Sequence, residues 1–510
     1  MWQFTFLEIV ISCVTILTVL YYYSITKHSY WTGKNVEGPK PLPIYGNFLD
    51  VALMKTSLAE KLRDFYQLWK HKPFIGLFHG TVPVVMISDL TLLKHVFVKD
   101  FTTFTDRGLL VNEDVDPLSN NLFSTGGHRW RRLRSKLSPV FTSGKLKQMY
   151  HLLSECADHF EKYVIDLAAK GDPIECKEIT AKFTTDVIGS CAFGLNMNAL
   201  ASENSEFRKM GKKVFDPSVR DSVVRTMRDS LPVLFKFLKI RVFSREMTKF
   251  FVNSTAETIA YRIKHNIVRP DFIHLLMELR KDSDPTDFEW TDELVAAQVF
   301  IFFLAGFETS ATTISFALYE LAQNESIQEK LRDEIQNALK THNGSLPFEV
   351  IKELKYLDKV FQETLRKHPP LSFLSRRSVK DYTIPDTTVH IPSGTKIFIP
   401  ILGLHHDPQY YPDPEVFDPE RFAAEAVQKR PQMAYLPFGE GPRICIGARF
   451  AVYQTKMGII QILKNFKVSL CSKTKVPYDI DPTTFVLSAR DGFRESGRRR
   501  EGQEGKNRIR

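Results

Sequence analysis

The spacing of apolar and polar residues predicts a mainly α-helical protein with small β-sheets, an α+β fold class. Residues 56–72 show the 3.6-residue period of an amphipathic helix. Two apolar stretches, residues 74–79 and 82–87, flank a glycine turn and predict a hairpin. Downstream the helical period dominates, and residues 381–394 interrupt it with short strands and turns. The chain is therefore expected to be helical around a few short strands.

The longest helical pattern covers residues 291–324. Thr291 is a suitable N-cap, and two acidic residues follow it in the first turn. In the middle of the pattern, Gly306 lowers helix propensity, and Thr309 can bond back to a carbonyl and open the helix locally. Positions that break local rules inside a strong helix are candidates for function. Glu308 beside Thr309 places an acid next to a hydroxyl, which suits proton transfer.

An apolar run at residues 4–23 has about the length needed to cross a bilayer, and Glu8 is its only charge. It lacks the basic start and the small-residue cleavage site of a secretory signal, so we expect a retained anchor. Lysines at positions 27, 34 and 40 favour a cytosolic location for the chain that follows. A buried core helix is the alternative.

These patterns predict four parts. No linker, repeat or low-complexity tract divides residues 40–485, which favours one large domain. Residues 490–510 hold eight Lys/Arg against four Asp/Glu, a composition typical of disorder, and we expect no nucleic-acid binding from it. The parts are an anchor (1–25), a basic and proline-rich hinge (26–45), one large folded domain (46–488) and a basic, disordered tail (489–510).

The composition suits a large core and an apolar pocket, because 43% of residues are hydrophobic and 39 are Phe. The six cysteines show no paired spacing. A zinc or disulfide framework is therefore not expected, and a reducing compartment is.

Residues 438–447 (FGEGPRICIG) place one thiol, Cys445, in a glycine-rich loop. The glycines at 439, 441 and 447 allow tight turns and a close approach to a flat ligand. Arg443 adds a permanent cation. A helical pattern follows at once, and the N-terminus of a helix favours the thiolate form. Haem fits these properties, whereas the alternative is a buried structural cysteine in an ordinary turn.

Other motifs pair chemically useful side chains on predicted helices. Trp130 and Arg134 are four residues apart, so they share one face, and both can donate to a carboxylate. The further basic residues around them are equally consistent with a solvated face and with a docking surface for an acidic protein. Glu363 and Arg366 also share a face.

Together these motifs resemble those of the cytochrome P-450 superfamily, the haem-thiolate monooxygenases, in its microsomal class. The anchor, proline hinge, W-x-x-x-R, A-G-x-E-T, E-x-x-R, P-E-R-F and F-x-x-G-x-R-x-C-x-G occur in the family's order across residues 25–488. Segments 141–145 and 185–189 are most similar to the insect sixth family. The resemblance implies the cytochrome P-450 fold, with haem between the long central helix and the cysteine loop, plus an N-terminal transmembrane helix.

The resemblance also assigns roles to residues. Haem b would be the cofactor, and Cys445 its iron ligand, which favours O–O cleavage. Thr309 and Glu308 would guide protons during oxygen activation. Arg421 would join Glu363 and Arg366 in a cluster that locks the chain before the cysteine loop. The other cofactor contacts implied are Phe438 and Arg443 in the loop, and Trp130, Arg134, Arg376 and Arg107 at the haem propionates.

The implied reaction inserts one oxygen atom of O2 into lipophilic small molecules: xenobiotics, plant toxins, insecticides or endogenous lipids. Apolar side chains that include residues 300–303 would hold the substrate. Electrons would come from NADPH through a separate flavoprotein reductase, with cytochrome b5 as a further partner. The implied location is the endoplasmic reticulum membrane, with a single anchor in the lipid and the catalytic domain facing the cytosol.

Two alternatives stay open. A haem-thiolate isomerase or dehydratase of peroxides would need no electron donor, and the Glu308–Thr309 pair argues against it. A non-catalytic membrane haem binder gains weight from one departure. After Ser488 the family has a glycine turn and a short apolar strand, whereas residues 491–500 (DGFRESGRRR) are highly charged.

Overall fold

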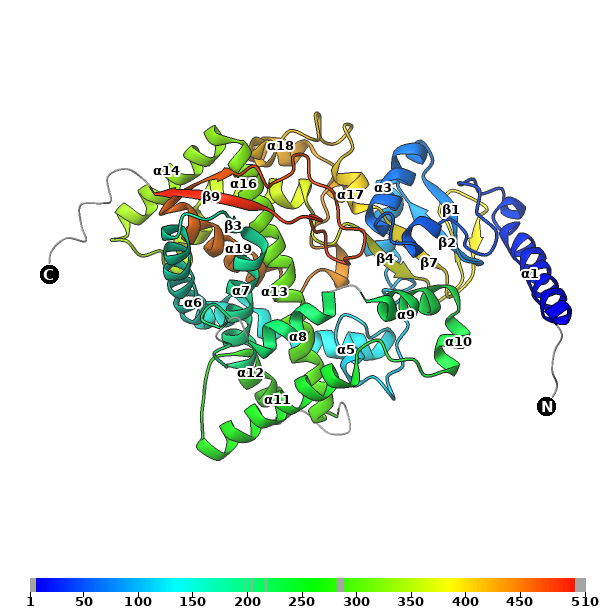
Figure 1. The fold of residues 1–510 in the computed structure, drawn as a ribbon, viewed down its shortest axis with the longest axis horizontal. Helices are drawn as coiled ribbons and strands as arrows, with labels where there is room; N and C mark the ends of the chain where they lie inside the picture. Colours follow the sequence, from blue (N-terminus) through cyan, green and yellow to red (C-terminus); the bar gives the residue numbers. More distant parts are fainter. Residues whose placement is uncertain (1–5, 198, 203–204, 216–217, 282–288, 500–510) are drawn as a thin grey trace. The chain divides into compact units, whose positions relative to one another are not determined.

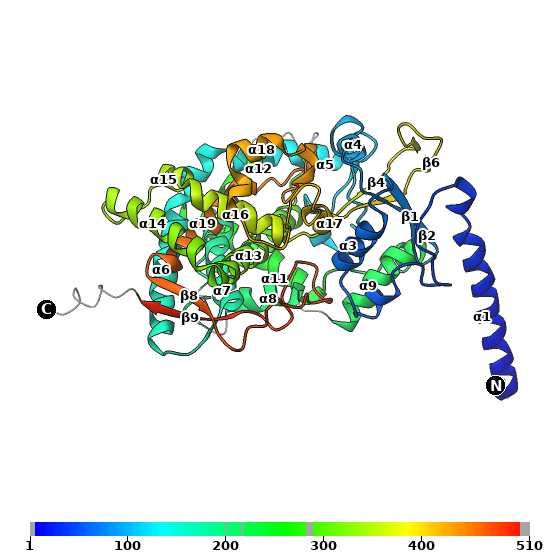
Figure 2. The same ribbon diagram turned by 90° about the horizontal axis from the view of Figure 1, so that it is seen from above.

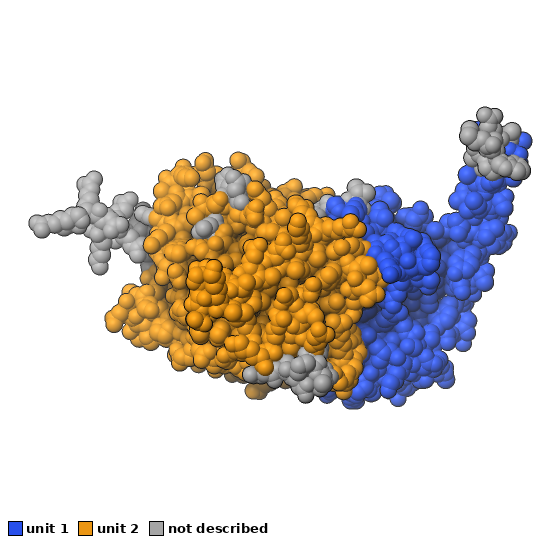
Figure 3. Space-filling model, turned by 90° about the horizontal axis from the view of Figure 1, so that it is seen from below, with its two compact units in different colours: residues 1–110, 218–240, 373–404 blue, residues 111–217, 241–372, 405–510 orange. Residues whose placement is uncertain are grey.

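The computed structural model describes residues 6–197, 199–202, 205–215, 218–281 and 289–499. The chain divides into two compact units, coloured separately in Figure 3, where the sequence predicts one domain. The bounds predicted for that domain, 46–488, remain a prediction. Unit 1 consists of residues 1–110, 218–240 and 373–404, and unit 2 of residues 111–217, 241–372 and 405–510.

Unit 1 is built on a four-stranded sheet with the order β1-β2-β7-β4. β1 (Phe74–His79) and β2 (Val82–Ile87) form the predicted hairpin. β7 (Lys396–Ile399) pairs in parallel with β2 and antiparallel with β4 (Leu374–Arg377). Most residues of β1, β2 and β7 are buried, which explains why the sequences of these three strands are largely apolar.

Helix α3 (Leu58–Trp69) lies within the predicted helix at residues 56–72. Ser57 caps it in a capping box, because its hydroxyl accepts from the backbone of Glu60, whose carboxylate accepts from the backbone of Ser57. The remaining elements of unit 1 are η1 (Thr32–Lys34), α2 (Leu49–Ala52), α4 (Leu90–Lys94), η2 (His95–Lys99), α9 (Val219–Ser230), α10 (Pro232–Phe237), β5 (Tyr382–Thr383), β6 (His390–Ile391) and α17 (Ile401–His405), whose last residue belongs to unit 2.

The N-terminal helix α1 (Phe6–His28) is apolar and almost fully exposed, and it is long enough to cross a membrane. It extends away from the rest of unit 1 (Figures 1 and 2). Its C-terminal end is fixed, because the Ser24 hydroxyl accepts from the backbone N–H of Ile44 at 2.7 Å. Trp31 is only 3% exposed and donates to the carbonyl of Leu77. Much of the segment expected to be a hinge is therefore docked on the sheet.

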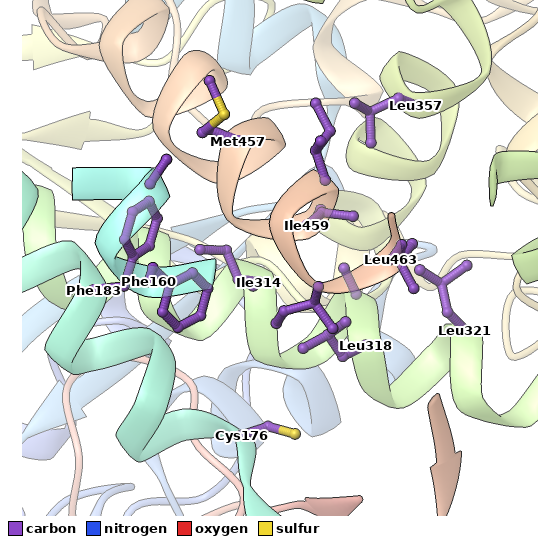
Figure 4. Packing of buried hydrophobic residues seen from close by; sticks show 14 of the residues in the cluster. Phe160, Cys176, Phe183, Ile314, Leu318, Leu321, Leu357, Met457, Ile459 and Leu463 are labelled. Carbon is purple, nitrogen blue, oxygen red and sulfur yellow. The ribbon is translucent and has the colours of Figure 1, made fainter. Parts of the chain in front are cut away.

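Unit 2 is organised around the long helix α13 (Asp292–Gln323), which Thr291 caps as predicted. It packs against α7 (Cys176–Ile188) and α19 (Ala448–Leu463), and Figure 4 shows their apolar side chains meeting. A Cβ at Gly306 would lie 2.3 Å from Cδ1 of Ile188. The glycine singled out in the sequence therefore permits the close approach of α7 to α13.

Helices of very different length surround this core, and several short helical turns occur between them. The helices are α5 (Gly127–Leu137), α6 (Ser143–Ala169), α8 (Glu206–Phe215), α11 (Arg245–His265), α12 (Phe272–Lys281), α14 (Glu325–Thr341), α15 (Phe348–Glu353), α16 (Lys355–Lys367) and α18 (Ala424–Lys429). The short turns are η3 (Pro117–Ser119), η4 (Ser138–Phe141), η5 (Gly189–Phe193), η6 (Pro419–Phe422), η7 (Gln432–Ala434) and η8 (Gly441–Arg443).

The C-terminal segment forms a strand, which the sequence did not predict. β9 (Arg494–Arg499) lies between β3 (Ile174–Glu175) and β8 (Phe466–Leu470) in an antiparallel sheet. The expected disorder of residues 489–510 is thus wrong for this strand, because backbone pairing does not depend on side-chain polarity. Residues 500–510 of the predicted tail lie outside the described residues.

Candidate active site

The cysteine loop precedes α19 and is held by its own backbone. The N–H of Cys445 donates to the carbonyl of Phe438 at 2.9 Å. Gly439 and Gly441 have φ values of 75° and 73°, so glycine is needed at both. Gly447 is the N-cap of α19 with φ −92° and needs no such freedom, contrary to the expectation for this third glycine. The Cys445 residue is exposed, so its thiol is accessible to a ligand.

Arg443 connects this loop to helix α5. Its buried guanidinium donates to the carbonyl of Thr125 at 2.8 Å, and its central carbon lies 4.0 Å from the ring centre of Trp130. Burial lowers the pKa of Arg134, and the nearby thiol of Cys445 opposes that shift. Arg443, predicted beside the thiol, and Arg134, predicted at a propionate, therefore both lie in unit 2, and Arg443 is already engaged by protein groups.

A buried ionic cluster lies in the chain before the loop, as predicted. Glu363 accepts two bonds of 2.8 Å from Arg366, and its Oε1 lies 3.5 Å from Nε of Arg421. The same oxygen accepts from the N–H of Asp418, the residue before η6. Burial raises the pKa of Glu363, and Arg366 counteracts this shift. The cluster thus fixes α16 to the segment that leads to the cysteine loop.

His405 adds a second support that no sequence motif indicated. Its Nε2 accepts from the N–H of Leu436 at 3.0 Å, and its Nδ1 lies 3.2 Å from the carbonyl oxygen of Arg366. Burial lowers the pKa of His405 to about 3, so the ring is neutral and can accept one bond while it donates the other. The start of the cysteine loop is therefore tied to α16 through this imidazole.

The middle of α13 exposes a small polar spot on a largely buried helix. Thr309 Oγ1 donates to the carbonyl of Ala305 at 2.6 Å, as predicted, and Ala305 is exposed. The helix remains continuous here, so the expected local opening is not observed. The neighbouring Glu308 is 6% exposed, and its Oε1 lies 3.0 Å from Nζ of Lys177 on α7. Lys177 is a site residue that the sequence reasoning missed, because nothing in the sequence connects it to position 308.

Three phenylalanines of α13 expected to hold substrate, at positions 300, 302 and 303, instead pack against neighbouring elements. Phe300 and Phe303 are fully buried, with ring centres 4.9 and 5.4 Å from that of Phe251 on α11. Phe302 packs on Phe141 at 5.2 Å. These rings join α13 to its neighbouring elements, so they belong to the packing of unit 2.

In unit 1, Arg376 on β4 is 2% exposed, and its Nε has no hydrogen-bond partner among the described residues. Burial lowers its pKa to about 9, and the positive charge of Arg107 adds to this shift. Ser375 donates to the carbonyl of Arg107 at 2.8 Å, which keeps the two arginines close. Two adjacent cations with an unused donor fit an anionic group such as a carboxylate.

These features fit haem. An accessible thiol in a glycine loop suits an axial iron ligand. In unit 2, Arg134 near the thiol suits a propionate. In unit 1, the adjacent Arg107 and Arg376 by themselves suit a carboxylate. The exposed Ala305 and the Thr309 hydroxyl present a small, polar surface on α13.

Comparison with known proteins agrees with this assignment. Residues 36–493 match the family described as Cytochrome P-450. The chain is 41% identical over 498 residues to cytochrome P-450 6k1 of Blattella germanica, covering 94% of each chain. It is 41% identical over 488 residues to the probable cytochrome P-450 6a13 of Drosophila melanogaster, covering 95% of this chain and 98% of that protein. Cytochrome P-450 6a2 of the same fly is 38% identical over 503 residues, covering 96% of this chain and 99% of the relative.

Proposed function

Because the chain belongs to the cytochrome P-450 family, we propose that Cys445 binds the haem iron and that Glu308 and Thr309 supply protons to the reaction. The family and the insect sixth-family relatives make the protein a haem-thiolate monooxygenase of xenobiotics. It uses haem b and O2, and it takes electrons from NADPH through a reductase. The residue roles are the part proposed here.

Haem bound through Cys445 supplies the oxygen-activating chemistry. The chain itself must hold and move protons. The Thr309 hydroxyl donates its own proton to Ala305, so its oxygen is free to accept another hydrogen bond. The buried carboxylate of Glu308, on the next residue, can take up a proton and release it. In this proposal the two groups, on consecutive residues of α13, take part in one short proton relay.

The remaining proposed contacts hold and orient the cofactor. Trp130 and Arg134 on α5, and Arg107 and Arg376 in unit 1, provide donors for the propionates. Phe438 and Arg443 shape the loop around the thiol, the former through its carbonyl bond to Cys445.

The N-terminal helix fits a membrane anchor. We place the protein in the endoplasmic reticulum membrane with its catalytic part in the cytosol, because lysines follow the apolar run and α1 emerges from unit 1. Membrane lipid would then surround α1. The exposed basic residues of α5 suit an acidic redox protein, and we propose cytochrome b5 as a partner in addition to the reductase.

The observation that carries this proposal is the accessible Cys445 thiol, fixed by the carbonyl of Phe438 close to Arg134. The test uses the full chain in membranes with a flavoprotein reductase, NADPH, a lipophilic substrate and isotopically heavy O2. We expect one heavy oxygen atom in the product, and less product per NADPH for Glu308→Gln and Thr309→Ala. Conversion of a peroxide without NADPH, with no oxygen taken from O2, would instead support the isomerase alternative.

A further inference from the structure

Lys177 connects the predicted proton relay to the C-terminal segment. Its Nζ lies 3.0 Å from Oε1 of Glu308 and donates to Oγ of Ser488 at 2.9 Å. Its side chain is 29% exposed, whereas that of Glu308 is 8% exposed. The ammonium therefore reaches from the surface to a buried carboxylate.

The register of α7 on α13 makes this ion pair a fixed feature. Thr180, one turn after Lys177, lies 2.9 Å from the hydroxyl of Ser315. Thr184 donates to the carbonyl of Phe307 at 2.9 Å. Together with the close approach of Ile188 to α13 described above, these contacts run along one face of α7. Lys177 is the first residue of this face, so the packing of α7 on α13 fixes the position of its Cα.

Residues near the C-terminus fix the position of the Lys177 ammonium. Ser488 is buried, and its carbonyl accepts from the N–H of Asp481 at 2.8 Å. Further on, the carbonyl of Phe493 accepts from the N–H of Cys176 at 2.8 Å. Gly492 has a φ of 66°, and a Cβ there would lie 2.8 Å from Oε1 of Glu175. The turn before β9 is thus seated on the first turn of α7, beside Lys177.

We propose that Lys177 is a positioning residue of the monooxygenase: held by Ser488, its ammonium keeps the carboxylate of Glu308 in one orientation next to Thr309. The inference rests on the proposed role of Glu308. It also gives the chain that leads into the unusual C-terminal segment a part in proton delivery, because Ser488 lies just before that segment and the carbonyl of Phe493, within it, accepts from the N–H of Cys176. A buried carboxylate with a rotatable side chain gains orientation only from such a specific partner.

The test compares Lys177→Met, Lys177→Arg, Ser488→Ala and Glu308→Gln in the haem-loaded, full-length protein. The matched control is Lys182→Met, on the same helix, because Lys182 donates to the hydroxyl of Tyr163 and not to a carboxylate. Three quantities are measured: the thermal midpoint, in a double-mutant cycle of positions 177 and 308, the product formed per NADPH consumed, and KM for the substrate.

We expect Lys177→Met to lower product per NADPH by roughly tenfold with little change in KM, as for loss of an oriented proton donor. Lys177→Arg should keep most of the wild-type product per NADPH, and Lys182→Met should match the wild type. Ser488→Ala should give a value between those of the wild type and Lys177→Met. In the double-mutant cycle, the variant changed at both positions should have a thermal midpoint no lower than that of the less stable single variant. Each single change already removes the ion pair, so the second change has no pair left to break.

Three results would overturn the inference, and each would point to a different reason for its failure. Additive thermal effects at positions 177 and 308 would show that the pair does not form. Coupled thermal effects with unchanged product per NADPH for Lys177→Met would show a purely structural pair. If Glu308→Gln itself leaves product per NADPH unchanged, the proposed relay fails, and the inference fails with it.

Discussion

The guanidinium of Arg443 stacks on the ring of Trp130, with its central carbon 4.0 Å from the ring centre. The same guanidinium donates to the backbone of Thr125. The cation two residues before the thiol therefore fastens the cysteine loop to α5, in addition to the electrostatic role that the sequence suggests. A planar, multidentate cation is needed for both contacts at once.

Arg443→Lys should therefore weaken the site although the charge is kept. A lysine cannot stack and donate to the backbone together, so we expect a loss of roughly 2 kcal/mol in unfolding free energy and less haem per protein. Denaturant unfolding and haem content provide the measurement. Arg449→Lys is the control and should behave as wild type, because Arg449 is exposed in the first turn of α19. Equal haem content in both variants would contradict the account.

Glu363→Gln should be strongly destabilising. The change leaves Arg366 buried without a counter-charge, which costs about 3–5 kcal/mol. Glu420→Gln is the matched control, because its carboxylate pairs with Lys330 and Lys359 at the surface and is worth about 0–1 kcal/mol. Unfolding in urea compares the two. Similar losses for both variants would show that the cluster does not lock the chain.

The stability of the protein should fall between pH 4.5 and pH 8 because of Glu495. Burial raises the pKa of this carboxyl to about 8 in the folded chain, from 4.5. In that window the unfolded chain releases a proton that the folded chain keeps, so rising pH favours unfolding until the folded pKa is passed. Glu495→Leu removes this penalty of about 3–5 kcal/mol at pH 8 and little of it at pH 4.5.

The measurement for Glu495 is the unfolding free energy of both chains at several pH values. Asp491→Leu is the control, because Asp491 is exposed in the same segment. A Glu495→Leu gain that is independent of pH would refute this origin of the effect.

Two N-terminal truncations should separate anchoring from folding. Deletion of residues 2–23 removes most of the apolar helix and keeps the Ser24 bond to Ile44, so the protein should leave the membrane fraction with an unchanged thermal midpoint. Deletion of residues 2–31 also removes buried Trp31 and should cost about 3 kcal/mol in addition. Membrane retention of the shorter truncation would show that another surface holds the protein to lipid.

Signals between residues close in the sequence account for the features that could be predicted correctly. The pattern at residues 291–324 predicts α13 because an N-cap and an apolar period are local signals. Glu308 and Thr309 stand out because they break those signals, and the Glu363 cluster follows from helix spacing together with the family's motifs.

Contacts between distant segments explain what could not be predicted. Lys177 is an ordinary helix lysine until α7 packs on α13, and His405 supports Leu436 only through the tertiary fold. β9 forms although its side chains are charged, because β3 and β8 provide backbone partners that no local pattern shows. The phenylalanines expected to hold substrate are buried against α11 for the same kind of reason.

The most direct test of the central claim is the absorption spectrum of the reduced, CO-bound protein. If the Cys445 thiolate binds the haem iron, the wild-type protein must show the strongly red-shifted Soret band of a thiolate-ligated haem, and Cys445→Ala must lose it. A wild-type Soret band at the shorter wavelength of haem without thiolate, or a red-shifted band that survives Cys445→Ala, would contradict the account.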